Sequence, residues 1–185
     1  MLDRIRLLVL DVDGVLSDGR ITYAADGTEV KTFSAADGQG LKYWLRAGHD
    51  AAILSGRDSE TVRIRARELG IARVRTGAKD KLPAFEALLG ETGCRADEVC
   101  YIGDDLVDVP VMARAGLAVA VPEAPAEVRR LAHYVTRRPG GAGAVREVVE
   151  LLLRFQGRWP EITRRYRERL PEDLPPVRRP WRDRP

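Results

Sequence analysis

The sequence has little of what membrane-spanning, secreted and disulfide-stabilised proteins need. Its 185 residues include only two cysteines, Cys94 and Cys100, which are too few for a disulfide framework and lack metal-ligand spacing. No apolar run reaches the roughly 18 residues of a membrane-spanning helix. The N-terminus leads directly into an apolar segment without the hydrophobic region and cleavage site of a signal peptide. These absences predict a cytoplasmic globular protein with no membrane partner.

Excess positive charge is confined to the end of the chain. The whole sequence has a net charge of +3, but residues 157–185 carry nine arginines against five acidic residues, which leaves the rest nearly neutral. We therefore expect no nucleic-acid partner. Six prolines follow Trp159, interleaved with arginines. This composition predicts a domain over residues 1–157 and a Pro- and Arg-rich tail over residues 158–185, with at most one short helix at 161–170.

Up to that tail, apolar strand-like runs alternate with helical patterns, which predicts an α/β protein with a parallel sheet covered on both faces, in three Rossmann-like layers. The Asp26-Gly27 pair predicts a β-hairpin over residues 20–33. Strands are expected at residues 5–10, 51–54, 73–75, 99–102, 117–121 and 134–136. Helices are expected at residues 40–46, 59–69, 81–89, 107–115, 126–132 and 145–155.

Polar residues gather just after these strands. Because the carboxyl ends of parallel strands meet at one edge of an open sheet, we expect the following side chains to lie close together. They are Asp11 and Asp13, then Ser55, Gly56 and Arg57, then Lys79 and Lys81, and finally Asp104, Asp105 and Asp108.

This set of residue types favours phosphate chemistry. Carboxylates crowded at one point need a cation among them, and hard oxygen ligands suit Mg²⁺. A cation, a hydroxyl and a lysine together can bind a phosphate group. One carboxylate can then attack phosphorus while a second moves protons, and Asp11 and Asp13 have suitable spacing. Alone, each motif is more typical of a turn, a helix cap or a surface charge; their order after successive strands favours the catalytic interpretation.

Four segments resemble the motifs of the haloacid dehalogenase superfamily of phosphatases. Four further stretches resemble a subfamily of sugar-phosphate phosphatases that lack a large cap domain. The superfamily motifs are residues 11–19 (DVDGVLSDG), residues 53–57 (ILSGR), Lys81, and residues 102–108 (IGDDLVD). The subfamily stretches are residues 15–19 (VLSDG), which continue the first motif, Phe33 with residues 37–40, residues 105–112, and residues 140–147.

The resemblance implies a role for each matching residue. Asp11 would be the nucleophile and Asp13 the general acid and base. Mg²⁺ would be held by Asp11, the main-chain carbonyl of Asp13, and Asp104, with Asp105 and Asp108 supporting it. Ser55, Gly56 and Lys81 would bind the phosphoryl group. Lys81 is chosen over Lys79 because it is followed by an apolar residue, as in the family pattern.

The resemblance also implies a substrate and an assembly. The substrate would be an eight-carbon 3-deoxy-2-ulosonate 8-phosphate of lipopolysaccharide sugar synthesis. In place of a cap there would be a small hairpin and a homotetramer, with Arg146 in a segment that can reach the substrate of a neighbouring subunit. Two alternatives stay open: a phosphatase for a nine-carbon sugar acid 9-phosphate, and a non-catalytic assembly subunit with the same fold.

Overall fold

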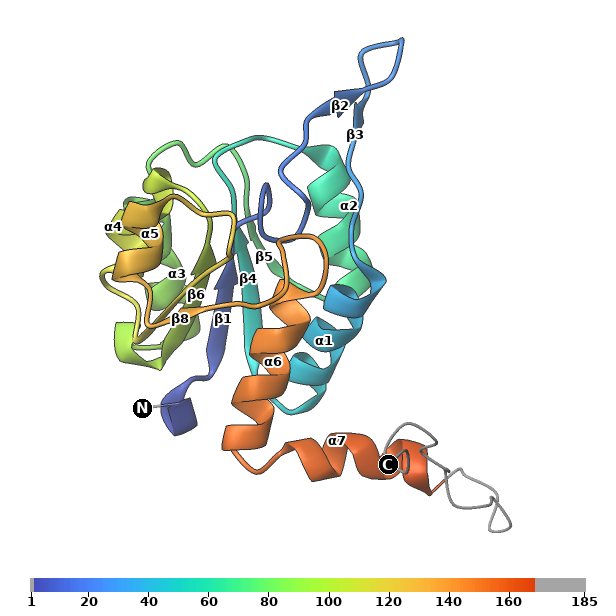
Figure 1. Cartoon of the computed structure of the whole chain (residues 1–185), viewed down its shortest axis with the longest axis vertical. Helices are drawn as coiled ribbons and strands as arrows, with labels where there is room; N and C mark the ends of the chain where they lie inside the picture. The colour runs from blue at the N-terminus through green and yellow to red at the C-terminus, as the bar shows by residue number, and fades with distance from the viewer. Residues whose placement is uncertain (1, 169–185) are drawn as a thin grey trace, which may run out of the picture.

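All six strands of the central sheet run parallel, in the order β5-β4-β1-β6-β7-β8 (Figure 1). The computed structural model describes residues 2–168. The strands are β1 (Leu7–Leu10), β4 (Asp50–Leu54), β5 (Arg73–Arg75), β6 (Val99–Gly103), β7 (Leu117–Ala120) and β8 (Tyr134–Val135). Every residue of β1 is buried, because this strand has a neighbour on each side and helices on both faces. The predicted three-layer α/β fold is confirmed.

Helices cover both faces of the sheet (Figure 1). On one face lie α1 (Ala35–Arg46), α2 (Glu60–Leu69) and α6 (Ala144–Phe155), and on the other α3 (Lys81–Thr92), α4 (Val109–Met112) and α5 (Ala126–Leu131). Short 3-10 turns lie at η1 (Leu2–Arg4), η2 (Ala96–Glu98) and η3 (Leu106–Asp108). No helix among residues 2–168 is long and apolar enough to cross a membrane.

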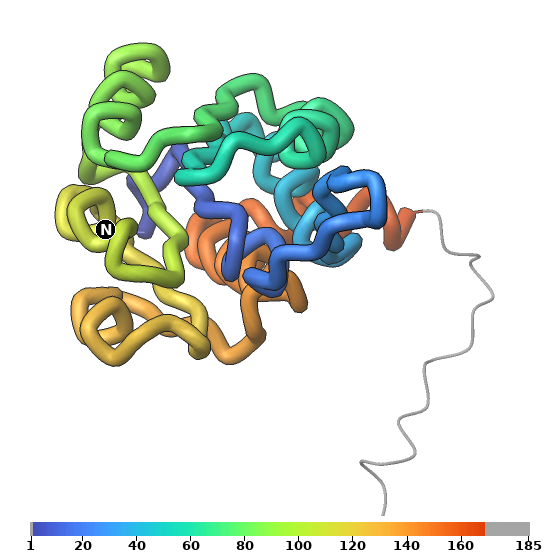
Figure 2. The backbone as a smooth tube through the Cα atoms, turned by 90° about the horizontal axis from the view of Figure 1, so that it is seen from above, coloured from blue at the N-terminus to red at the C-terminus, as the bar shows by residue number. Residues whose placement is uncertain are grey.

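A β-hairpin follows the first strand, as predicted. It consists of β2 (Thr22–Tyr23) and β3 (Glu29–Val30), joined by a turn in which Gly27 has a φ of +84°. It projects beyond the end of the sheet at which the strands have their carboxyl ends, and within residues 2–168 no large second domain stands over that end (Figures 1 and 2). The apolar side chains of Ile21, Tyr23 and Val30 are exposed on it.

Two predicted helices differ most from those in the structure, and the helix predicted over residues 81–89 extends to Thr92. The first helix begins at Ala35 rather than near residue 40, because the Ser34 side chain caps it by accepting the Asp37 N–H. The segment predicted as one helix over residues 107–115 is instead η3 followed by the four-residue α4. Asp105 caps η3 through the Leu106 N–H, and Pro110 lies in the first turn of α4.

A last helix, α7 (Trp159–Arg167), continues the chain beyond α6. Its Ile162 is buried, and its Trp159 ring meets the Tyr43 ring edge-on at a centroid distance of 5.9 Å. The domain boundary at residue 157 stays a prediction, and the rest of the proposed tail, residues 169–185, lies outside the described residues.

Helices α1 and α6 approach each other closely at Gly40, where a larger residue would crowd the facing helix. A Cβ on Gly40 would lie 3.1 Å from the Cα of Arg146. The buried carboxylate of Asp37 accepts the N–H groups of Gly143 (3.0 Å) and Arg146 (2.7 Å), which are free donors at the start of α6. The two helices are thus tied together, and the loop before α6 is fixed over the end of β1.

Candidate active site

Asp11 directly follows β1 at the centre of the sheet. Its backbone N–H donates to the Ile102 carbonyl (3.0 Å), which extends the strand pairing, and its side chain is almost wholly buried. Lys81, the first residue of α3, places its Nζ 2.9 Å from Asp11 Oδ1. Lys79 is exposed, so the structure brings Lys81 and not Lys79 to the predicted nucleophile.

Asp108 fixes the ammonium group of Lys81. Its Oδ1 lies 2.6 Å from Lys81 Nζ and also accepts the Tyr101 hydroxyl (2.6 Å), while its Oδ2 accepts the N–H groups of Asp104 and Asp105. Burial alone would lower the pKa of Lys81, but the charges of Asp11 and Asp108 outweigh it and raise that pKa. Lys81 therefore stays protonated, as a phosphate-binding cation must.

Three carboxylates meet beside this lysine. One oxygen each from Asp11, Asp104 and Asp108 lie within 4.8 Å of one another. Asp104 Oδ1 is buried and has no hydrogen-bond partner among the described residues, whereas both oxygens of Asp108 already accept hydrogen bonds. Gly14 leaves space for this group, since a Cβ there would lie 2.1 Å from Asp104 Oδ2. The residues fit a hard divalent cation, with Asp11 and Asp104 as the carboxylates free to bind it.

The protonation of this cluster reflects its burial. Burial, and then the charge of Asp11, raise the pKa of Asp104 to about 8. Burial likewise raises the pKa of Asp11 to about 6, although Lys81 opposes the shift. Since a cation binds only the ionised carboxylates, its binding must release protons in this range.

From these shifts we predict that stability gained from Mg²⁺ increases with pH. A carboxyl whose pKa is raised by folding stabilises the folded state when protonated, below pH about 4, and this contribution is lost as pH rises towards 8. Without metal, the melting temperature should therefore fall between about pH 5 and about pH 9. Mg²⁺ at about 100 times its Kd should add about 2.7 kcal/mol at high pH and much less at low pH.

Scanning calorimetry with and without Mg²⁺ at the two pH values would check this. The matched control is Asp104→Asn, which should remove most of the pH dependence and most of the Mg²⁺ effect. Equal stabilisation by Mg²⁺ at both pH values would contradict the expected proton release.

Ser55 and Gly56 follow β4 and lie at the same edge of the sheet. The Ser55 side chain is buried, its N–H donates to the Arg75 carbonyl (2.8 Å), and its Oγ accepts the Arg57 N–H (3.4 Å). Asp105 is different. Its carboxylate is exposed and caps η3, so only its backbone N–H, which donates to Asp108, supports the cluster.

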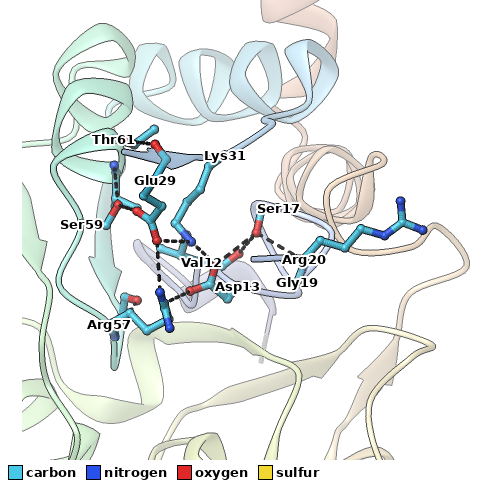
Figure 3. A network of polar contacts seen from close by, with 12 residues as sticks. Val12, Asp13, Ser17, Gly19, Arg20, Glu29, Lys31, Arg57, Ser59 and Thr61 are labelled. Atoms are coloured by element: carbon cyan, nitrogen blue, oxygen red, sulfur yellow. Dashed lines mark hydrogen bonds and ion pairs between the residues drawn. The ribbon is translucent and has the colours of Figure 1, made fainter. Parts of the chain in front are cut away.

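Asp13 comes two residues after Asp11, and its side chain points toward Lys31 of the hairpin segment and toward Arg57 (Figure 3). Its Oδ1 contacts Lys31 Nζ and accepts the Ser17 hydroxyl (3.4 Å), and its Oδ2 lies 3.8 Å from Arg57 Nε. Sequence reasoning missed Lys31 and Glu29 and gave Arg57 no role. The one available signal was that Glu29 and Lys31 alternate along a strand, which puts both side chains on one face.

The glycines before α6 close one wall of the site. A Cβ on Gly140 would lie 1.7 Å from the Gly14 carbonyl oxygen, and the Gly141 N–H donates to the Val15 carbonyl (2.8 Å). A side chain at Gly140 would therefore displace the loop that carries Asp13.

Arg146 lies elsewhere, on α6. Its Nε lies 2.7 Å from Glu150 Oε1, and its guanidinium lies 4.7 Å from the Tyr43 ring centroid. Within its own chain, Arg146 therefore contacts Glu150 and Tyr43 and not the active-site carboxylates. Its contact with the substrate of a neighbouring subunit stays a prediction.

Known proteins are similar to this chain in both sequence and fold. Residues 70–147 match the model of a family described as haloacid dehalogenase-like hydrolases. The chain is 48% identical over 152 residues to the 3-deoxy-D-manno-octulosonate 8-phosphate phosphatase of Yersinia pestis, covering 82% of this chain and 81% of the relative. It is 46% identical over 159 residues to the Escherichia coli enzyme of that name, covering 86% of this chain and 85% of the relative.

A solved structure of a phosphatase with the same name is also similar to this chain. The phosphatase of that name from Moraxella catarrhalis, in complex with a magnesium ion, a phosphate ion and a KDO molecule, superimposes with a TM-score of 0.87 at 41% identity. The match covers 89% of this chain and 95% of the Moraxella chain.

Proposed function

Since the chain belongs to the 3-deoxy-D-manno-octulosonate 8-phosphate phosphatases, a family of haloacid dehalogenase-like hydrolases, we propose that it hydrolyses this phosphate ester to 3-deoxy-D-manno-octulosonate and phosphate. It is a phosphoric monoester hydrolase that uses Mg²⁺. The observation that carries the proposal is the position of Asp11. Its buried carboxylate lies 2.9 Å from the Lys81 ammonium and next to Asp104, whose Oδ1 has no hydrogen-bond partner within residues 2–168.

The residues around Asp11 have complementary parts in the reaction. An Asp11 oxygen attacks phosphorus, the ester P–O bond breaks, and Asp13 donates a proton to the departing sugar oxygen. Water then attacks the aspartyl phosphate with Asp13 as the base, which frees Asp11 and phosphate. Lys81, Ser55 and Gly56 hold the phosphoryl oxygens throughout.

Mg²⁺ would be held by Asp11, Asp104 and the main-chain carbonyl of Asp13. When bound, the cation would neutralise part of the negative charge of the phosphate group. Asp108 supports this arrangement by holding Lys81 and the Asp104 backbone. The complete set of carboxylates and the lysine argues against a non-catalytic subunit, and the relatives described above give no support to a nine-carbon substrate.

The proposal extends to assembly and location. In the part of the chain that the structure describes, no second domain covers the site, and the hairpin exposes Ile21, Tyr23 and Val30. Both features support a homotetramer in which hairpins of different subunits pack together. Light scattering should then give four times the 20.6 kDa chain mass, and a monomer would contradict it. Cys94 and Cys100 are free thiols, which supports the cytoplasm as its location.

The decisive experiment measures phosphate release from 3-deoxy-D-manno-octulosonate 8-phosphate, with Mg²⁺ and with a chelator. We expect turnover that the chelator abolishes and added Mg²⁺ restores. Hydrolysis of a nine-carbon 9-phosphate but not of the eight-carbon ester would overturn the substrate and keep the chemistry. No hydrolysis of either would overturn the enzyme.

A further inference from the structure

Four side chains of alternating charge form a ring between the hairpin and the active site (Figure 3). Lys31 Nζ contacts Asp13 Oδ1 and lies 3.3 Å from Glu29 Oε1. Arg57 closes the ring, with its Nε 3.8 Å from Asp13 Oδ2 and its Nη2 3.4 Å from Glu29 Oε1. Each charge therefore has an opposite charge on both sides.

Lys31 is the buried member of this ring. Its side chain is 1% exposed, against 44% for Arg57. An ammonium group so far from water needs fixed partners, because it has no solvent to replace them. Its two carboxylate partners, Asp13 and Glu29, both belong to the ring, so the position of the Lys31 ammonium helps to fix these two carboxylates.

The ring is anchored to the body of the protein through Glu29. The Ser59 hydroxyl donates to Glu29 Oε2, and Thr61 Oγ1 donates to the Glu29 main-chain carbonyl (3.4 Å). Ser59 is itself the cap of α2, where it accepts the Val62 N–H. The ammonium of Lys31 is thus held against a helix end of the rigid domain rather than on a free hairpin.

The two oxygens of Asp13 are held unequally. Oδ1 has Lys31 and the Ser17 hydroxyl (3.4 Å) beside it, whereas Oδ2 lies 3.8 Å from Arg57 Nε. One oxygen is therefore fixed and the other remains available for proton transfer.

We propose that Lys31 is a positioning residue that holds Asp13 so that its Oδ2 donates the proton to the departing oxygen. The inference rests on the proposed function. As the Asp11–phosphorus bond forms and the ester P–O bond breaks, the proton passes from Asp13 Oδ2 to the leaving oxygen. The carboxylate left on Asp13 keeps Lys31 as its partner. The hairpin segment thus holds the general acid in position, besides contacting other subunits.

If Lys31 had a purely structural role, its removal would slow the hydrolysis of all substrates alike. If Lys31 positions the general acid, its removal should slow hydrolysis most for substrates with poor leaving groups. A poor leaving group needs the proton, while a good one such as p-nitrophenolate departs without it. The constant kcat/KM isolates this step, because it excludes the later breakdown of the aspartyl phosphate. Substituted phenyl phosphates vary the leaving group without adding sugar contacts.

The test compares Lys31→Ala with the native chain on this series in the presence of Mg²⁺. We expect kcat/KM to fall by about 100-fold for phenyl phosphate but by less than about tenfold for p-nitrophenyl phosphate, the pattern expected also of Asp13→Asn. Lys42→Ala, which removes an exposed lysine of α1, should leave both constants unchanged. Lys31→Met, which keeps the apolar stem, serves as the second variant if Lys31→Ala does not fold, and is judged by the same ratio.

Equal losses across the series, or no loss, would overturn the positioning role while leaving the proposed function intact. A native chain that releases no phosphate from its sugar substrate would instead overturn the proposed function.

Discussion

Asp11→Asn is expected to lower Mg²⁺-dependent phosphate release by at least about 10⁴-fold, because it removes the nucleophile of the first half-reaction, without which no aspartyl phosphate forms for water to hydrolyse. The substitution keeps the shape of the side chain and removes one charge from a crowded carboxylate cluster. We therefore expect the variant to fold as well as the native chain without metal, which circular dichroism melting would check.

Trapping the intermediate distinguishes a nucleophile from a mere metal ligand. Asp13→Asn should accumulate phosphate on Asp11 after reaction with p-nitrophenyl phosphate, since the base that activates water is lost. Mass spectrometry of the acid-quenched protein would detect it. Phosphate release by Asp11→Asn within tenfold of the native rate would show that the nucleophile lies elsewhere.

Lys81→Ala is expected to cost both activity and stability. Loss of the phosphate-binding ammonium should lower kcat/KM by roughly 10³-fold. It also leaves Asp11 and Asp108 buried without their shared cation, which should lower the free energy of unfolding by about 3 kcal/mol in metal-free protein. Phosphate release and urea denaturation measure the two effects.

Lys79→Ala is the matched control for this substitution. Lys79 lies two residues before Lys81 but is exposed, so both quantities should stay at native values. A large loss of activity at Lys79 with none at Lys81 would reverse the assignment of the phosphate-binding lysine.

The carboxylate cluster could be predicted from the sequence because strand order and strand direction bring its members together. Asp11 follows β1 and Asp104 follows β6, and these strands pair side by side in parallel, so their ends coincide. Lys81 opens the helix that leads into β6, so its ammonium reaches the same point. These positions depend on the backbone of the sheet, which hydrophobic patterning reveals.

The surroundings of Asp13 could not be predicted in that way. Lys31 reaches Asp13 only because the hairpin folds back over the end of β1, and no local pattern encodes that angle. The early start of α1 at Ala35 was missed for a related reason. Its first turn contains Asp37, a buried carboxylate that is stable there only because α6 offers two free N–H groups. Such partners, distant in sequence, become visible only in three dimensions.

The central place of β1 also constrains when the site can be completed during synthesis. The strand that precedes Asp11 is made before both of its neighbours, β4 (Asp50–Leu54) and β6 (Val99–Gly103). A ribosome-bound chain that ends before residue 99 thus has one edge of its most apolar strand without a partner, which is an aggregation hazard. The strand pairs that β1 forms join residues far apart in the sequence, so the sheet cannot be completed early in synthesis. Chaperone contact with the nascent chain is therefore most useful before β6 emerges.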